Sequence, residues 1–388
     1  MPHSRTAFET VEISRWDREL SNSTSERATI TDVKHLASYN WIDAPTPTIV
    51  VPGCPPYWFP PKGAHRLQKD TGLIYIDRNA ALHPNSPLEP LFRSLYLASP
   101  SFDINAVDIV TDRNIIRKLL SFVNSSFAKN GLKSFTIQVE INFETAIFCR
   151  EEIASREVIE PEEFRGYGHG FEKAYTKDQI PGSTAHHRII SYQLAGLKFL
   201  VRHETDGYVD NPGFMKSDQS IAGLGGLLES LSLSSTTTST VQPPARSQLT
   251  IKNAGRVVPR ASTLELKTRA AHKPFDFSEV APQIWISQTP KLVRAYHNRG
   301  TFSDPDVEDV AAAIKEWEWS HQDDIKKLVA LLNWILKVAR SWGGSSIIRY
   351  DDRKDKLVIM RTQTRKMLPD DLYKRWTRTV STSTRSED

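Results

Sequence analysis

The chain has 388 residues, of which 39% are hydrophobic and 25% charged, a composition typical of a folded protein with one large domain or two. Its 50 lysine and arginine residues nearly balance 46 acidic residues, and the net charge of +4 excludes a uniformly basic protein, so a polyanion would need a local basic patch. The two cysteines, Cys54 and Cys149, are far apart, fit neither a disulfide framework nor a zinc spacing, and indicate a reducing compartment.

The N-terminal segment, residues 1–27, is polar and rich in serine, and we expect a flexible arm without a secretory signal. From Asp32 to Lys62, short apolar runs alternate with turn signals and prolines, a pattern that predicts extended or polyproline-like chain. This stretch begins the single domain that we expect over residues 28–376.

A helix is predicted to begin after Thr111 and Asp112, where Asp112 is a favourable capping residue. Arg113 and Arg117 lie one turn apart on one face of this helix. The apolar residues recur at three-to-four spacing on another face, and they are Ile115, Ile116, Leu119, Leu120 and Val123.

Two pairs of strands are predicted in the middle of the chain. Residues 135–140 alternate between apolar and polar side chains, and residues 145–149 follow as the partner strand. Residues 189–201 contain two further strand-like runs, with Ala195 and Gly196 as the turn between them.

A composition shift marks residues 217–260, which are rich in Ser, Thr, Gly, Pro and Leu. Such a stretch buries too little apolar surface to offset the entropy of ordering it, so we predict a disordered insertion in the domain. A short helix at Ile221–Leu233 is predicted inside this insertion.

Helices and one more hairpin complete the predicted domain. An apolar run extends from Gln283 to Tyr296, and a long helix runs from about Asp323 to Trp342. Its most apolar part, Leu328–Ala339, is interrupted by Asn333 and Lys337 and is too short to span a bilayer, so we expect a soluble, intracellular protein. The last predicted elements are the strands Ser346–Tyr350 and Lys356–Arg361 and a disordered tail at 377–388. Strands outnumber long helices, which predicts an α+β fold of mixed β-sheets flanked by helices.

Charged residues spaced two apart end two of the strand-like runs. Glu204 and Asp206 share one face of the first run, and Glu265 and Lys267 share one face of the second, because side chains in a strand repeat every two residues. Three carboxylates that meet at one point repel one another unless a cation neutralises them. A hard divalent ion with oxygen ligands, Mg²⁺ or Mn²⁺, is the simplest answer.

A fourth carboxylate, Glu172, lies upstream in the run Gly168-His169-Gly170-Phe171-Glu172. The ordered set of motifs resembles the DXO family of RNA-decapping nucleases, in which an Arg precedes a glycine-containing motif that ends in Glu, then E-Φ-D, then E-Φ-K, then a Gln. In this chain the corresponding residues are Arg113, Gly168 to Glu172, Glu204 to Asp206, Glu265 to Lys267, and Gln283. The resemblance covers roughly Asp32 to Trp376 and implies a DXO-like nuclease core.

The resemblance implies a site with two Mg²⁺ or Mn²⁺ ions. Their ligands would be Glu172, Asp206, Glu265 and the backbone carbonyl of Leu266, with Glu204 bound through water. Glu204, Asp206, Glu265 and Lys267 would form the catalytic set, with Lys267 near the attacking water and the scissile phosphate. Arg113, Gln283 and Lys267 would contact the RNA.

The implied activity is hydrolysis at RNA 5′ ends: decapping, pyrophosphate removal or deNADding, with 5′–3′ digestion as a further activity. The implied partners are RNA 5′ ends and a 5′–3′ exoribonuclease, in the nucleus, without a membrane, haem or nucleotide cofactor. An alternative is a weakly active relative that serves as a scaffold for RNA 5′ ends or an exoribonuclease. Isoprenoid diphosphate synthesis is disfavoured, because the Asp-Asp pairs lack the third Asp of a D-D-x-x-D motif.

Single residues also have simpler interpretations. Glu172 is compatible with an exposed carboxylate paired with a neighbouring lysine, Arg113 with an ordinary ion pair, and Gln283 with the start of a strand. The adjacent His186 and His187 point to opposite faces of a strand, which favours structural roles. The tryptophans are expected in the core, with Trp58 as the one to test for stacking on a nucleobase.

This chain also departs from the family pattern. His169 and Gly170 stand where the family has bulkier residues, and we expect them to loosen the segment that carries Glu172. Asp112 precedes Arg113 and is expected to weaken the local positive field.

Overall fold

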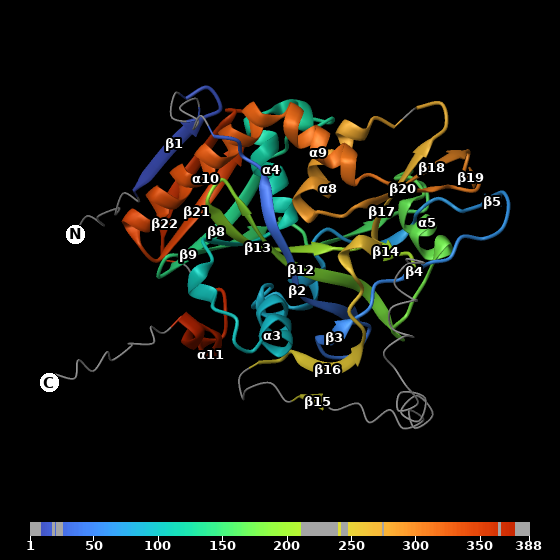
Figure 1. Cartoon of the computed structure of the whole chain (residues 1–388), viewed down its shortest axis with the longest axis horizontal. Coiled ribbons are helices and arrows are strands. Elements are labelled where there is room, and N and C mark those ends of the chain that lie inside the picture. The colour runs from blue at the N-terminus through green and yellow to red at the C-terminus, as the bar shows by residue number, and fades with distance from the viewer. Residues whose placement is uncertain are drawn as a thin grey trace, which may run out of the picture.

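The computed structural model describes residues 9–17, 20, 26–210, 240–241, 247–273, 275–363 and 366–376, with 240–241 described by their backbone alone. In this part of the chain, the strands form a 12-stranded sheet, an 8-stranded sheet and a two-stranded pair. Helices cover these sheets (Figure 1). The predicted α+β class with mixed sheets is confirmed.

The 12-stranded sheet contains both parallel and antiparallel neighbours. In spatial order its strands are β1 (Thr10–Ser14), β22 (Lys356–Thr362), β21 (Ser345–Asp351), β8 (Phe135–Asn142), β9 (Thr145–Glu151), β7 (Ile109–Asp112), β13 (Leu197–Glu204), β12 (Ser183–Leu194), β2 (Ile30–Ile42), β3 (Thr48–Gly53), β16 (Thr250–Gly255) and β15 (Thr240–Val241).

The 8-stranded sheet is made mostly of short strands around a parallel pair. Its order is β11 (Thr176–Lys177), β4 (Tyr57–Trp58), β14 (Gly207–Tyr208), β17 (Thr263–Ala270), β18 (Lys291–Asn298), β19 (Thr301–Phe302) and β5 (His65–Arg66), with β20 (Val307–Asp309) also paired to β18. The two-stranded pair joins β10 (Arg156–Ile159) and β6 (Gly72–Tyr75).

The α-helices of the described chain are α2 (Arg78–Leu82), α3 (Glu89–Ala98), α4 (Arg113–Val123), α5 (Gly168–Tyr175), α8 (Ala281–Ser287), α9 (Ala311–Ser320), α10 (Gln322–Trp342) and α11 (Asp370–Tyr373). Short 3₁₀ turns occupy Ile104–Ala106, Ser125–Phe127, Arg260–Ser262, Phe277–Glu279 and Lys374–Trp376. No helix in this part of the chain is long and apolar enough to cross a membrane.

Helices pack on both faces of the large sheet. Along β13, Phe199 and Val201 join a core with α4, α8, α9 and α10, whereas Leu200 joins a second core with α3 and α11. Figure 1 shows the two groups of helices on opposite sides of the sheet. This alternation with a period of two explains why consecutive residues at the centre of β13, Phe199 to Val201, are all apolar.

The two large sheets meet where the chain leaves one for the other. β13 ends at Glu204, and after Thr205 and Asp206 the chain enters β14, which pairs antiparallel with β17. β17 carries Glu265 and Lys267, so this junction brings the two charged runs together.

The structure confirms the helix at 113–123, both strand pairs in the middle of the chain, the long helix and the last hairpin. It corrects two other predictions. β16 lies inside the predicted insertion 217–260, because it pairs parallel with β3 and buries Ile251. β1 lies in the predicted arm and pairs with β22. The apolar run from Gln283 to Tyr296 contains the end of α8, which was not predicted, and most of β18. The predicted helix at 221–233 and the predicted disordered tail at 377–388 lie outside the described residues.

Candidate active site

Glu265 is the centre of the candidate site. Its side chain is buried, with 1% of the residue exposed, and accepts a hydrogen bond from Arg113 Nη1 at 3.0 Å. Lys267 Nζ lies 2.5 Å from Glu265 Oε1, and the Gln283 amide donates to the same oxygen. Arg113 from α4 and Gln283 from α8 therefore meet Lys267, two residues further along β17, at one carboxylate.

The strand pattern explains this convergence. In β17, Leu264 and Leu266 pack into the core of the 8-stranded sheet, so the alternating Glu265 and Lys267 face the site. Gln283 comes from helix α8, where Pro282 lies in the first turn, rather than from the start of a strand.

Asp206 and Glu204 flank this centre. The Leu266 backbone amide donates to Asp206 Oδ2 at 2.8 Å, and Lys267 Nζ lies 3.2 Å from the Leu266 carbonyl oxygen. Glu204 is more open, with 46% of its side chain exposed, and lies 4.0 Å from the guanidinium of Arg78. The acidic groups therefore differ in solvation as well as in position.

The pKa values record how closely the charges are placed. Burial, followed by the nearby Glu204, raises the pKa of Glu172 to about 7. Burial and Glu265 also raise the pKa of Asp206 well above its usual range. Both carboxyls therefore lack enough positive charge around them to balance burial and repulsion.

Glu265 shows the opposite result. Burial would raise its pKa, but the ion pairs with Lys267 and Arg113 outweigh burial and hold the pKa at about 2. Burial would lower the pKa of Lys267, yet Glu265 and Asp206 raise it above the usual value. This pair is charged in the folded chain.

The helix that carries Glu172 is capped by a residue that the motifs did not predict. Asp70 accepts hydrogen bonds from the backbone amides of His169 at 3.1 Å and Gly170 at 2.9 Å. A Cβ at position 170 would lie 3.3 Å from the Asp70 carboxylate, so the glycine leaves room for it. We predicted that His169 and Gly170 loosen this segment, whereas Asp70 fixes its first turn through the helix N-terminus.

Asp112 also has another role than the predicted one. It occupies the N-cap position of α4, but its side chain makes no capping bond. Instead, its carboxylate accepts hydrogen bonds from two nitrogens of Arg202, from Nε at 2.6 Å and from Nη2 at 2.8 Å. Arg202 is fully buried, and this paired contact compensates its charge.

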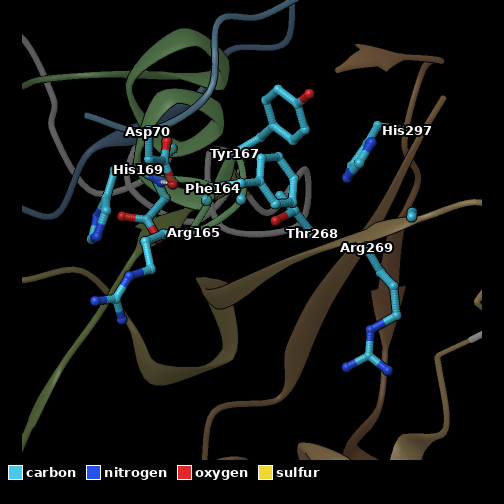
Figure 2. A pocket seen from close by; sticks show the side chains of 12 residues that line it. Asp70, Phe164, Arg165, Tyr167, His169, Thr268, Arg269 and His297 are labelled. Atoms are coloured by element: carbon cyan, nitrogen blue, oxygen red, sulfur yellow. Dashed lines mark hydrogen bonds between the residues drawn. The ribbon is translucent and has the colours of Figure 1, made fainter. Parts of the chain in front are cut away.

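A cavity of about 380 Å³ opens beside Glu172, and we call it the aromatic cavity. Figure 2 shows Phe164, Tyr167 and His297 around it, with Arg165 and Arg269 at its edges. Its remaining lining residues are Asp70, Gly166, Gly168, His169, Glu172, Thr268 and Ala270.

A second cavity, of about 220 Å³, opens beside Glu204, and we call it the arginine cavity. Four of its lining residues are arginines, from α4, β9 and β13. The lining consists of Ile76, Asn79, Asp112, Arg113, Asn114, Arg117, Arg150, Arg202, His187, His203, Glu204 and Gln283. Sequence patterns missed Asp70 and Arg150 because neither stands in a motif with the other site residues.

The donor chemistry of the site fits a hard divalent cation. Glu172, Asp206, Glu265 and the Leu266 carbonyl all offer oxygen, which Mg²⁺ and Mn²⁺ prefer. The raised pKa values of Glu172 and Asp206 show carboxyls that a nearby cation would stabilise in their charged form. Among the described residues, however, no group of three His, Cys, Asp or Glu side chains is close enough to hold one ion.

The remaining candidates from the sequence, His186, His187 and Trp58, have structural contacts. His186 and His187 are buried and bind Asn40 and Asn79 respectively. Trp58 is 9% exposed and packs against Phe171 and Tyr175 rather than presenting a stacking face.

Solved structures share this fold at low sequence identity. Rai1 of Scheffersomyces stipitis, solved with (3′-NADP)⁺ and calcium, has a TM-score of 0.59 and 13% identity over 97% of this chain and 99% of that one. Rai1 of Candida albicans, solved with pU5 and Mn²⁺, has a TM-score of 0.58 and 12% identity over 95% and 99%. Dxo1 of K. lactis, solved with manganese, has a TM-score of 0.50 and 9% identity over 93% and 100%.

At these identities the similarity establishes a common fold, in agreement with the DXO-like core that the motifs predicted. Among curated proteins, none matches this sequence. A family model described as a domain of unknown function, DUF8563, matches residues 11–376. The chain therefore belongs to the DUF8563 family and has the fold of the Rai1 and Dxo1 proteins.

Proposed function

We propose that the chain is a metal-dependent hydrolase of RNA 5′ ends, which removes a cap, a pyrophosphate or an NAD moiety by attack of water on phosphorus. The observation that carries the proposal is the convergence of Arg113, Lys267 and Gln283 on the buried Glu265, at the junction of two sheets in a Rai1-like fold. An ordinary ion pair does not require three partners, two of which, Arg113 and Gln283, come from separate helices.

Two Mg²⁺ or Mn²⁺ ions would be held by Glu172, Asp206, Glu265 and the Leu266 carbonyl, with Glu204 bound through water. When bound, such ions supply charge stabilisation to the phosphate oxygens. The calcium and manganese in the Rai1 and Dxo1 structures support this assignment.

The protein's own residues would orient the phosphate and balance its charge. The Lys267 ammonium lies next to Glu265 and would neutralise charge that develops on the phosphate oxygens. The planar guanidinium of Arg113 suits two phosphate oxygens, and the Gln283 amide would hold the RNA backbone beside it.

A specific observation also favours the scaffold alternative. Both oxygens of Glu265 are engaged by Arg113, Lys267 and Gln283. A carboxylate held in this way must lose ion pairs before it can bind a metal ion, so metal binding would be weak. The protein would then be a weak enzyme that still recognises RNA 5′ ends.

The test is incubation of the purified protein with Mn²⁺ and RNAs that bear triphosphate, unmethylated-cap, NAD or monophosphate ends, with the products resolved. We expect metal-dependent release from at least one 5′ end and its loss in Glu265→Gln. Glu12→Gln, an exposed carboxylate on β1, is the matched control and should retain activity. Binding of these RNAs without turnover in any divalent metal would replace the hydrolase with the scaffold.

A nuclear location, an exoribonuclease partner and 5′–3′ digestion remain predictions from the family resemblance. Localisation of the tagged protein and co-purification with a 5′–3′ exoribonuclease would test the first two. Release of nucleoside monophosphates in the assay above would test the third.

A further inference from the structure

The helix that carries Glu172 has little stability of its own. α5 spans only the eight residues Gly168–Tyr175, and an isolated helix of that length is marginal in water. Gly168 and Gly170 are two of its first three residues, and glycine is among the poorest helix formers. The N-cap residue, Tyr167, makes no side-chain capping bond. The first turn of α5 therefore depends on contacts from elsewhere in the chain.

Asp70 supplies these contacts, although it precedes His169 by 99 positions in the sequence. Its carboxylate accepts hydrogen bonds from the backbone amides of His169, at 3.1 Å, and Gly170, at 2.9 Å. Its own backbone amide donates to the Gly166 carbonyl oxygen at 2.9 Å. Figure 2 shows Asp70 beside His169 at the edge of the aromatic cavity. Three hydrogen bonds thus fix this one residue to the start of α5.

The helix amides are also what compensates the burial of this carboxylate. Asp70 is 8% exposed, and no lysine, arginine or histidine of the described chain forms an ion pair with it. A buried carboxylate without hydrogen bonds or a cation would be costly. The two amides and the positive end of the helix dipole offset that cost. The contact between Asp70 and α5 is therefore specific rather than incidental.

The close fit at Gly170 couples the two partners further. A Cβ at position 170 would lie 3.3 Å from Asp70 Oδ1 and 3.5 Å from the Gln68 carbonyl oxygen. A side chain at this position would press on the carboxylate, so either the carboxylate or the first turn of α5 would have to move. The glycine weakens the helix but allows the aspartate to approach it.

The remainder of α5 is anchored around Glu172. Phe171 is fully buried, and its ring stacks on Tyr175 and contacts Phe302, at centroid distances of 4.0 and 4.8 Å. Thr176 Oγ1 donates to the Glu172 carbonyl oxygen at 2.7 Å. Glu172 therefore lies between these anchors and the first turn that Asp70 holds. A shift of that turn changes the direction in which the Glu172 side chain points.

We propose that Asp70 is a positioning residue of the candidate metal centre, which sets metal affinity by fixing the helical turn that leads to Glu172. This inference rests on the proposed function, in which Glu172 is a metal ligand, and it adds a residue that belongs to none of the motifs. Loss of a group that orients a metal ligand typically weakens metal binding about 10–100-fold.

The test is calorimetric titration of Mn²⁺ into the full chain, well below its unfolding temperature. We expect Asp70→Ala to weaken binding at least about tenfold, and Asp70→Asn, which keeps one acceptor oxygen, to weaken it less. Asp103→Ala is the control. Asp103 accepts from the Asn105 amide at 3.0 Å and caps the 3₁₀ turn Ile104–Ala106, so this variant should bind Mn²⁺ as the parent does.

Thermal unfolding of each variant separates positioning from stability. A lower melting temperature in Asp70→Ala with unchanged Mn²⁺ affinity would give Asp70 a purely structural role and overturn the proposal. No Mn²⁺ binding by the parent would overturn the proposed function and this role together. Binding by the parent that neither Asp70 variant changes would overturn the role of Asp70 alone.

A second variant tests the same contact in a chain that keeps the carboxylate. Gly170→Ala places a Cβ against Asp70 and should weaken Mn²⁺ binding several-fold, although alanine favours the helix. In Asp70→Ala the crowding is absent, so the added Gly170→Ala change should cause little further loss. Effects that multiply independently in the double variant would contradict the coupling.

Discussion

The two cavities beside the candidate active site differ in how their charges are balanced. In the aromatic cavity, Arg165 and Arg269 are partly exposed and paired with glutamates. In the arginine cavity, Arg202 and Asp112 form a buried ion pair, and Arg117 is an exposed cation without a carboxylate partner in the described chain. The ion pairs of the first cavity are therefore solvated, whereas the second cavity contains a pair removed from water.

This difference shows which charges are informative about stability and function. A solvated ion pair contributes little to the free energy of unfolding, since water already stabilises both partners, and so it indicates little about function. A buried ion pair carries more information, because removal of one partner leaves an uncompensated charge away from water. Substitutions on the two sides should therefore have unequal effects.

The largest difference is expected in stability. Asp112→Asn leaves the buried Arg202 uncompensated and should lower the free energy of unfolding by about 3–5 kcal/mol. Glu157→Gln removes the exposed partner of Arg165 and should cost at most about 1 kcal/mol. Urea unfolding of both variants measures these values, and similar losses would contradict the comparison.

The next effect concerns the reaction, if the proposed hydrolysis is found. Lys267→Ala removes the ammonium beside Glu265 and should lower kcat about 10²–10³-fold, because one preformed electrostatic contact is typically worth that much. Lys177→Ala, on the exposed end of β11, is the control and should have little effect. Steady-state kinetics would contradict the role of Lys267 if only KM changed.

Local patterns predicted the elements that carry these charges, but not all of their partners. The period of two placed Glu265 and Lys267 on one face, and three-to-four spacing predicted α4 with Arg113 and Arg117. The pairing of Asp112 with Arg202 joins residues 90 positions apart in the sequence, and no local pattern specifies such a contact. Folding, rather than spacing, selects those partners.

One missed helix and one wrong prediction have identifiable physical causes. The seven-residue helix α8 is too short for a clear helical period, although Pro282 in its first turn was a usable signal. β16 has few apolar residues, and its ladder with β3 forms through backbone groups that any sequence provides. The composition of this segment therefore predicted disorder, although its backbone hydrogen bonds to β3 order the strand.

Acid should destabilise the part of the large sheet where β2 and β12 carry His35 and His186. Burial and the nearby Arg188 lower the pKa of His35 to about 3 and that of His186 well below its usual value. The unfolded chain takes up these protons near pH 6.5 and the folded chain does not, so stability is lost as pH falls below 6.5. The slope is at most about 1.4 kcal/mol per pH unit for each histidine.

Urea unfolding between pH 7.5 and 5 measures this loss, and His35→Gln should make the dependence shallower. The pKa of His297, at the aromatic cavity, is also lowered by burial, but less of that ring is enclosed. His297→Gln should therefore change the pH dependence less than His35→Gln. A steeper effect from His297 would reverse the expected order.

The smallest effect is expected at the mouth of the aromatic cavity. Phe164 is 65% exposed, and its ring lies T-shaped to that of Tyr167 at a centroid distance of 5.6 Å, which leaves apolar ring surface for a nucleobase. Phe164→Ala should weaken binding of single-stranded RNA by about 1 kcal/mol, roughly fivefold, at the lower end for one stacked base. It should not change stability, because the ring buries little surface. Fluorescence anisotropy in Ca²⁺ measures the binding, with Phe143→Ala, another exposed ring in the β8–β9 turn, as the control. Equal losses in the two variants would mean that general surface apolarity, rather than the cavity, contributes to RNA binding.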